Sequence, residues 1–320
     1  MRTADGSNKV TTIIPVYNEE RFLRQCLGSV IHQADCVIIG DNASTDGTGG
    51  IGLEFANQYK HVQYIRHETN IGAIQNLARI ASLVKTEYVF QMGGHDELPV
   101  NFVATLKSRL QANPDAVCAY GNCYWMELDG TISKTLDFAS IQTGMLDKDP
   151  YVRATAFFRE KQPFDLIFGM YRSAVAIPIV METKPVAGCD YLLPVASLLA
   201  GKFVFAPETA YWRRKVHPQD TDKDYMTRIV GDHFVKLSRD NSAIGRQLLD
   251  WFWQHHNQQI LSSVQEKTFK ELLFQMAWRL DTPVSHPFWD SMFFLRRFWR
   301  NWYKYLKCRF IPGYAERKNL

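Results

Sequence analysis

Several features are missing from this sequence, and each absence narrows the class of protein. No apolar run approaches the roughly 20 residues that are needed to cross a bilayer. The best candidate, 192–205, is too short and contains Lys202. The first nine residues are polar and lack the apolar core of a secretory signal. We therefore expect a protein that does not cross a membrane.

The cysteines form no recognisable redox or metal-binding pattern. None of the six belongs to a CxxC pair or to a zinc-like spacing. Most lie in apolar runs, where a free thiol behaves as a small hydrophobic group. A reducing cytoplasm fits these cysteines best, so we expect a cytoplasmic protein.

Glycine-rich phosphate loops are also absent. The turn after the first predicted strand is P15-V16-Y17-N18-E19-E20, which contains no glycine. It is therefore neither a dinucleotide-binding G-x-G-x-x-G turn nor a Walker loop. Nucleotidyl transfer onto a sugar phosphate would normally require a Gly-rich loop with Lys or Arg here, so this turn disfavours that activity as well.

What is present is an alternation of strand and helix patterns in the first third of the chain. Apolar β-branched runs predict strands at 10–14, 36–39, 62–65 and 88–92, and the segments between them have helical spacing. This order predicts an α/β fold with a mainly parallel central sheet flanked by helices. The middle third predicts a hairpin with strands at 117–126 and from 132 onward, helices at 151–159 and 189–199, and a strand at 201–205.

Beyond about residue 220 the pattern changes to helices that are rich in aromatic residues. We therefore predict a catalytic or binding domain over 1–220 and a helical extension over 221–320. Residues 291–320 contain eight Lys and Arg against one Glu, although the whole chain has a formal net charge of only +4. The last helix separates basic from aromatic side chains, which is typical of a helix on a membrane surface.

Two interpretations of that last helix remain open. It can lie on a membrane surface through residues 291–311, with its cations on anionic lipid, or it can dock its apolar face on the first domain. We favour the membrane surface, and hence a peripheral location on the inner face of the cell membrane. Nucleic acid would also attract the charge, but no nucleic-acid-binding motif accompanies it, so we expect no such partner.

Polar loops follow each of the first four predicted strands. They are 17–19, 41–42, 70–72 and 93–97, and they are rich in Asn, Asp, Glu and Gly. In open sheets of this kind, ligands bind beyond the carboxyl ends of the strands. We therefore expect these loops to surround one ligand-binding crevice.

The same loops resemble the successive motifs of glycosyltransferase family 2, whose members are inverting enzymes with the GT-A fold. The motifs are I13 to E20, V37 to T48, N70-I71-G72 with N76, and Y88 to P99, and the resemblance covers roughly residues 9–217. It implies transfer of a sugar from a nucleoside diphosphate sugar to a saccharide or lipid-linked saccharide, as in surface polysaccharide assembly. The alternative is a non-catalytic nucleotide-sugar-binding or scaffolding protein.

The resemblance assigns roles to individual residues in the donor site. Those expected to bind the nucleotide sugar are Pro15, Tyr17, Glu19, Asp41, Asn42, Asn70, Gly72, Arg213 and His217. Asp41 and Asn42 would hold the base or ribose, and the basic segment 211–217 would face the diphosphate. F168-G169-M170-Y171-R172 resembles a segment that lines the sugar or acceptor pocket, although a strand end with packed aromatics explains it equally well.

The metal motif of the family, Asp-x-Asp-Asp, is depleted here. Its first acid is Gly93 and its second is His95, so only Asp96 remains. Asp96 with a diphosphate could hold Mg²⁺, and His95 would suit Mn²⁺. A third alternative is that His95 binds the diphosphate and that the metal is weak or missing.

The expected catalytic base is Asp190, in A187-G188-C189-D190-Y191. This segment is similar to the Glu-Asp segment of the family, with Cys189 in place of the first acid. An acid at the start of a helix also serves as a cap, so the sequence alone leaves a structural role open. The order of the motifs favours the base, which would accept the proton of the attacking hydroxyl.

Overall fold

The structure, a computed structural model, describes residues 6–157, 163–185 and 189–216. The chain divides into two units, Met1–Met276 and Ala277–Leu320, and all the described residues belong to the first. The predicted domain boundary near residue 220, the helical extension, the basic helix at 291–311 and His217 therefore lie outside the described residues.

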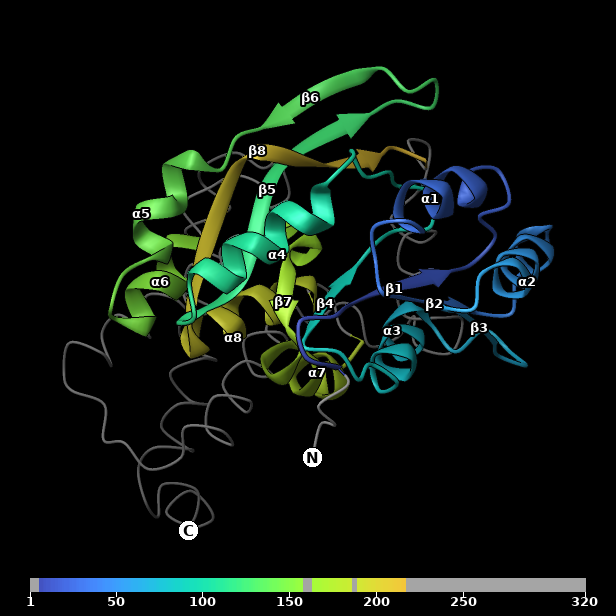
Figure 1. Ribbon diagram of the computed structural model, residues 1–320, viewed down its shortest axis with the longest axis horizontal. Helices are drawn as coiled ribbons and strands as arrows, with labels where there is room; N and C mark the ends of the chain where they lie inside the picture. Colours follow the sequence, from blue (N-terminus) through green and yellow to red (C-terminus); the bar gives the residue numbers. More distant parts are fainter. Residues whose placement is uncertain (1–5, 158–162, 186–188, 217–320) are drawn as a thin grey trace, which may run out of the picture. The chain divides into compact units, whose positions relative to one another are not determined.

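One eight-stranded sheet organises this part of the chain (Figure 1). Its main path has the order β3-β2-β1-β4-β7-β5-β6, and β8 pairs with β5 off this path. The first half contains β1 (Val10–Val16), β2 (Cys36–Asp41), β3 (Val62–Arg66) and β4 (Tyr88–Gln91). All pairings among these four strands are parallel, so their carboxyl ends share one edge of the sheet.

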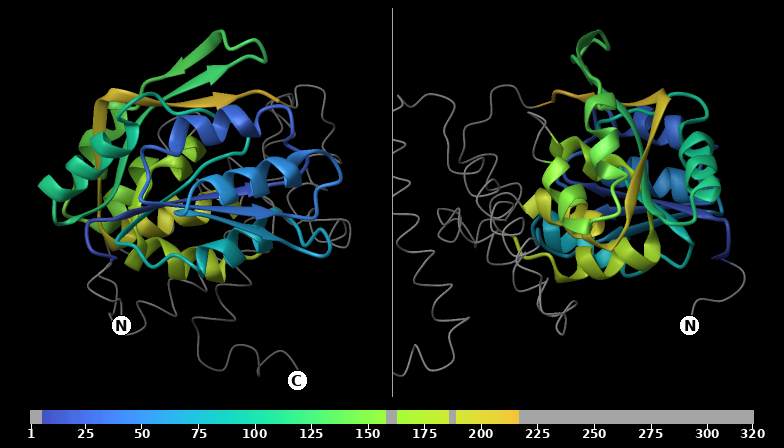
Figure 2. Two further views of the ribbon diagram at one scale, coloured as in Figure 1. Left: turned by 45° about the vertical axis from the view of Figure 1, so that its right-hand side comes forward. Right: turned by 90° about the vertical axis from the view of Figure 1, so that its left-hand side faces the viewer.

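The second half of the sheet is mixed. It contains β5 (Ala116–Met126), β6 (Ile132–Leu136), β7 (Met170–Arg172) and β8 (Lys202–Arg214). The short strand β7 is antiparallel to both β4 and β5, whereas β8 runs parallel to β5. The β5–β6 hairpin turns at Gly130, whose φ of 91° favours glycine, and it projects from the rest of the domain (Figure 2).

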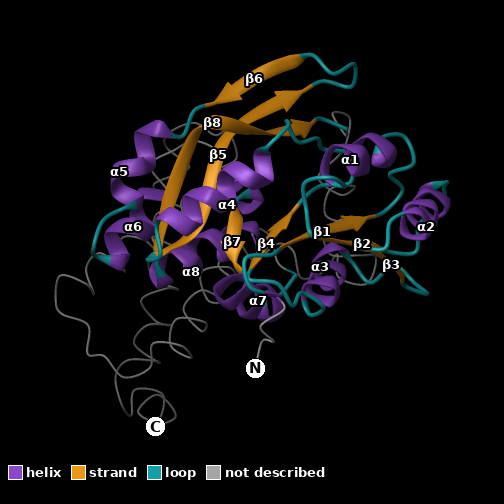
Figure 3. Ribbon diagram, viewed as in Figure 1, coloured by secondary structure: helices purple, strands orange, loops and turns teal. Residues whose placement is uncertain are grey.

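Helices cover both faces of the sheet (Figure 3). Helices α1 (Leu23–Val30) and α2 (Thr48–Gln58) lie on one side of β1–β3, and α3 (Ala73–Ala81) and α7 (Ser173–Glu182) lie on the other (Figure 1). The remaining helices are α4 (Phe102–Ala112), α5 (Gln142–Met145), α6 (Pro150–Ala156) and α8 (Leu192–Ala200), with short 3₁₀ segments η2 (Ala139–Ile141), η4 (Pro163–Phe168) and η5 (Cys189–Tyr191).

The sequence explains why β1 is central. Six of its seven residues are buried, as expected for a parallel strand covered on both faces by helices. Helix α3 packs so closely on the neighbouring strand that a Cβ at Gly40 would lie 2.5 Å from Oδ1 of Asn76. The Asn76 amide also donates a 2.7 Å hydrogen bond to the Gly40 carbonyl. These contacts hold helix α3 against β2 close to the carboxyl end of the strand, where the polar loops begin.

The structure confirms the predicted alternation of strands and helices in the first third and the hairpin in the middle third. It adds α4 and α7, which the sequence analysis did not predict, and extends the last strand from residue 205 to Arg214. In the described part of the chain, no helix is both long enough and apolar enough to span a bilayer.

Candidate functional site

The loops after β1 and β2 are joined by hydrogen bonds at the carboxyl edge of the sheet. The amide of Asn18 donates to Oγ of Ser44 at 3.0 Å, and the amide of Glu19 donates to Oγ1 of Thr48 at 2.7 Å. Asn18 also accepts a 2.8 Å bond from the amide of Thr45 through its side chain. Its φ of 56° lies in the left-handed region, which Asn tolerates better than most residues.

The loop after β3 is tied to the same edge by Asn42. Nδ2 of Asn42 donates to Oδ1 of Asn70 at 2.7 Å, and Oδ1 of Asn42 accepts from the amide of Ile71 at 2.8 Å. Oδ1 of Asn70 also accepts from the amide of Gly72. Gly72 has a φ of 88° directly before helix α3, so a side chain here would be strained. The amide of Asn42 thus joins two loops.

Asp41, the last residue of β2, is fully buried and fully hydrogen-bonded. Its Oδ2 accepts from the Tyr64 hydroxyl at 2.5 Å and from Nη1 of Arg66 at 2.8 Å, and its Oδ1 accepts from the amide of Ser44. Burial, together with the bond to Asp41, raises the pKa of Tyr64 to about 12. The Arg66 side chain is half exposed whereas Asp41 is buried, so Arg66 is the accessible member of this pair.

The loop after β4 meets the loop after β1 through His95 and Glu19. Nδ1 of His95 lies 2.8 Å from Oε1 of Glu19, and Nε2 lies 3.8 Å from Oδ1 of Asp96. Burial lowers the pKa of His95, but the two carboxylates outweigh that effect, and the net shift is upward from its usual value. Each of the two carboxylates thus favours the imidazolium form of His95.

Asp96 faces the protein interior and is 1% exposed. Its Oδ2 accepts from the Tyr211 hydroxyl at 2.6 Å, and its Oδ1 accepts from the amide of Arg214 at 2.8 Å. The same Tyr211 hydroxyl accepts a 3.1 Å bond from the amide of Gly93. Asp96 thus fastens the loop after β4 onto strand β8.

These residues do not fit the divalent cation that the sequence motif implies. Both oxygens of Asp96 already accept hydrogen bonds. A Cβ at Gly93 would lie 2.5 Å from Oδ2 of Asp96, so an acid at this position has no room in this arrangement. Across the described residues, no three His, Cys, Asp or Glu side chains are grouped to hold a metal ion.

Arg213 lies on β8 and forms an ion pair with Asp165 of η4. Its Nη1 lies 2.6 Å from Oδ1 of Asp165, and its guanidinium stacks over the Trp125 ring at 4.7 Å. Burial raises the pKa of Asp165 to about 6, although Arg213 acts in the opposite direction. Oδ2 of Asp165 has no hydrogen-bond partner among the described residues.

Two further expected donor-site residues lie at the end of β1. Pro15 pairs in register with Gly40 of β2. Tyr17, directly after the strand, is one of the exposed large side chains of the described chain. An exposed aromatic ring at the carboxyl edge offers a flat surface on which a base can stack.

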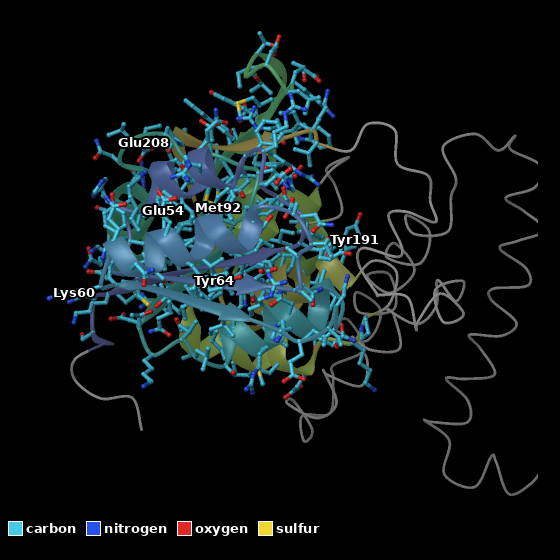
Figure 4. The ribbon with its side chains drawn as sticks, turned by 90° about the vertical axis from the view of Figure 1, so that its right-hand side faces the viewer. Glu54, Lys60, Tyr64, Met92, Tyr191 and Glu208 are labelled. Carbon is cyan, nitrogen blue, oxygen red and sulfur yellow. The ribbon has the colours of Figure 1, made fainter. Side chains whose placement is uncertain are left out.

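Asp190 lies in η5, directly before helix α8. The segment η5 packs against η4, which carries the Asp165 partner of Arg213, and the Asp190 side chain is partly exposed. In Figure 4, Lys60 before β3, Tyr64 within β3 and Tyr191 beside Asp190 follow one another from left to right. Tyr191 therefore lies toward the carboxyl end of β3 in this view.

Sequence reasoning did not identify three residues that shape the site. They are Tyr64, Arg66 and Asp165, and each pairs with an acid or base that the motifs did predict. Tyr211 was expected only as part of the basic segment 211–217, and the structure adds its hydrogen bond to Asp96. Tyr211 and Arg213 are two residues apart in β8, so their side chains share one face of the strand. A prediction that extended this strand to residue 214 would have placed them together. The 168–172 segment contributes Phe168, whose ring stacks on Tyr211 at 4.3 Å.

Comparison with known proteins supplies the family. The family model described as Glycosyl transferase family 2 matches residues 11–163. Glycosyltransferase GlyA of Streptococcus pneumoniae is 33% identical over 122 residues, which are 37% of this chain and 17% of GlyA. Abequosyltransferase RfbV of Salmonella typhimurium is 30% identical over 112 residues, which are 33% of this chain and 34% of RfbV. The match thus spans only a minor part of these curated relatives.

Among solved structures, S. aureus TarS 1-349 in complex with UDP-GlcNAc matches with a TM-score of 0.51 and 15% identity. The match covers 85% of this chain and 81% of the TarS chain. At this identity the likeness concerns the fold alone, and it confirms the GT-A fold expected from the sequence. The family match therefore assigns residues 11–163, just under half of the chain, to glycosyltransferase family 2.

Proposed function

We propose that the protein transfers a sugar from a nucleoside diphosphate sugar to a saccharide or lipid-linked saccharide, with inversion at the anomeric carbon. The observation that carries this proposal is the joining of four loops at one edge of the sheet. Asn42 connects the loops after β2 and β3, and the Glu19–His95 pair connects those after β1 and β4. A ligand that contacts all four loops therefore finds them already held together by hydrogen bonds.

The donor site has two chemically different ends. The Asp41–Arg66 corner and exposed Tyr17 offer hydrogen bonds and a ring face for a base. His95 and Arg213 offer basic N–H groups for a diphosphate. Relatives support this donor class, because TarS was crystallised with UDP-GlcNAc and RfbV is named an abequosyltransferase.

The reaction requires a base opposite the leaving group, and we assign that role to Asp190. Its carboxylate takes the proton from the acceptor hydroxyl while the hydroxyl oxygen forms a bond to the anomeric carbon. The bond from that carbon to the diphosphate oxygen breaks, and its electron pair leaves with the nucleoside diphosphate. The basic groups of His95 and Arg213 stabilise this developing charge. A single displacement of this kind inverts the configuration.

The proposal of a lipid-linked acceptor is based on the sequence of residues 291–311 and not on the described site. A lipid-linked saccharide is presented at a membrane, and the basic amphipathic segment 291–311 suits a peripheral position there. Deleting residues 291–320 is then expected to move the protein from the membrane fraction to the soluble fraction. An unchanged membrane fraction would contradict the anchor.

A second candidate function is non-catalytic nucleotide-sugar binding, which the depleted Asp-x-Asp-Asp motif favours. A thermal-shift panel of UDP-, GDP- and dTDP-sugars tests binding for both candidates, because a ligand of the native state raises apparent stability by mass action. Loss of donor in the presence of acceptor saccharides then separates enzyme from binding protein. No shift with any nucleotide sugar would refute both.

The assignment of Asp190 is tested by Asp190→Asn. We expect turnover to fall about 10²- to 10⁴-fold while donor affinity stays within about two-fold, because general-base catalysis acts in the transition state. Asp149→Asn is the matched control: Asp149 caps helix α6 through a 2.7 Å bond from the Tyr151 amide, and an Asn cap is equivalent. Full turnover in Asp190→Asn would remove Asp190 from this role.

A further inference from the structure

The loop after β4 differs from the metal motif of the family in shape as well as in composition. At its first position the chain carries Gly93, and the nearest atom to a Cβ there would be Oδ2 of Asp96 at 2.5 Å. Asp96, the only acid of the motif that this chain retains, thus fills the space that the side chain of a first acid at residue 93 would need. Adding a carboxylate at residue 93 would require Asp96 to leave its present position.

Asp96 is committed to holding the loop on β8. Besides its bonds to the Tyr211 hydroxyl and the Arg214 amide, the loop is attached by paired backbone bonds between Glu97 and Trp212, at 3.0 and 3.2 Å. The Arg214 side chain reaches the His95 carbonyl at 3.1 Å and pairs with the Glu97 carboxylate. A cation at Asp96 would therefore compete with the buried hydrogen bonds that already reach both of its oxygens.

Two partly exposed basic side chains, His95 and Arg213, lie at or beside the loop after β4. His95 occupies the second acid position, and its side chain is 21% exposed. Arg213, 28% exposed, lies on the same side of β8 as Tyr211, whose hydroxyl reaches the loop.

The formal charge of the loop points in the same direction. An Asp-x-Asp-Asp loop with three carboxylates and one divalent cation has a net charge of −1. In Gly93 to Asp96 the only carboxylate is Asp96, so the loop already has a charge of −1 with a neutral His95. Without any metal, the loop is therefore no more repulsive to a diphosphate than a metal-loaded loop with three acids.

We propose that this protein binds the diphosphate of its donor without a bridging divalent cation, with His95 and Arg213 as the basic contacts and Asp96 as a structural anchor. This inference rests on the proposed function, since it concerns the same donor site. Asp96, the remaining acid of the motif, then holds the loop after β4 on strand β8 and does not coordinate a metal.

Calorimetric titration of the full chain with UDP, GDP and dTDP tests the inference, each in EDTA, MgCl₂ and MnCl₂. We expect the nucleotide that binds to show the same Kd within about two-fold in all three conditions. His95→Asp replaces a proposed basic contact with a carboxylate, so we expect it to weaken the binding of that nucleotide in EDTA by about ten-fold or more; unchanged binding in EDTA would remove His95 from the diphosphate contacts. Thermal midpoints of each variant establish that it is folded.

The outcomes separate this inference from the proposed function. Wild-type binding that is about ten-fold or more tighter with Mn²⁺ or Mg²⁺ than in EDTA overturns the inference and leaves the proposed function intact. Loss of that difference in Asp96→Asn would identify Asp96 as a metal ligand. Binding that is equal in EDTA and in either cation, for both the wild type and Asp96→Asn, supports the inference. Absence of binding by any nucleotide in every condition overturns the proposed function, and the inference with it.

Discussion

Tyr211→Phe removes one hydroxyl from the attachment between the loop after β4 and strand β8. That hydroxyl donates to Oδ2 of Asp96 at 2.6 Å and accepts from the Gly93 amide at 3.1 Å. The ring stays in place, so its stacking on Phe168 is retained. The substitution therefore tests the two hydrogen bonds without creating a cavity.

We expect the removal of this one oxygen atom to lower the free energy of unfolding substantially. A hydrogen bond to a charged group contributes about 1.5–3 kcal/mol, and a buried amide that loses its acceptor costs about 1–3 kcal/mol. Because the two effects overlap, we expect the free energy of unfolding to fall by about 2–4 kcal/mol. At about 2–4 °C per kcal/mol, the thermal midpoint should fall by roughly 5–15 °C.

Tyr120→Phe provides a matched control from the same sheet. Tyr120 is 1% exposed, like Tyr211 a fully buried tyrosine, but its hydroxyl has no hydrogen-bond partner within the described residues. Removal of an unpaired hydroxyl should leave stability unchanged or raise it by up to about 1 kcal/mol. Scanning fluorimetry and urea titration of both variants measure the difference. If the two variants lie within about 0.5 kcal/mol of each other, the hydrogen bonds of Tyr211 do not anchor the loop.

Two further predictions concern packing and pH. Gly40→Ala should destabilise the fold by about 1–3 kcal/mol, because its Cβ would meet Asn76 at 2.5 Å and Ile80 at 2.6 Å; Gly28→Ala, exposed in α1 with nothing within 4 Å, should instead stabilise it by up to about 1 kcal/mol. A neutral or favourable Gly40→Ala in urea titration would contradict the close approach of α3. The pKa of Asp165 is about 6 in the folded protein against a usual 3.8, so the native state binds more protons between these values and stability falls as pH rises through this window, by about 3 kcal/mol. Asp165→Asn should remove this pH dependence, and parallel stability curves for the two proteins from pH 4 to 8 would refute it.

The sequence predicted those parts of the fold that local periodicity determines. The strands β1 to β4 and the helices between them follow from β-branched runs separated by helical spacing, and their order implies a parallel sheet. Helix α7 was not predicted because SAVAIPIVME is apolar on most sides and contains Pro178, which hides its helical period. The extension of β8 to Arg214 depends on pairing with β5, which no local pattern reveals.

For the site, the motifs predicted which loops meet but not what holds their side chains. Tyr211 and Asp96 are separated by 115 residues in sequence, and Arg213 and Asp165 by 48. Such pairs depend on tertiary packing, so neither composition nor spacing indicates them. The same limit applies to Asp96, whose position in a metal motif suggested a ligand although its oxygens bind a hydroxyl and an amide.

Strand β8 has a mechanical consequence. It runs from Lys202 to Arg214 in one ladder with β5, and its last residues hold the loop after β4 through backbone and side-chain bonds. Arg214, the last residue of the strand, donates through its amide to Asp96 and through its side chain to the His95 carbonyl. A displacement of this end of β8 would therefore act directly on the loop after β4.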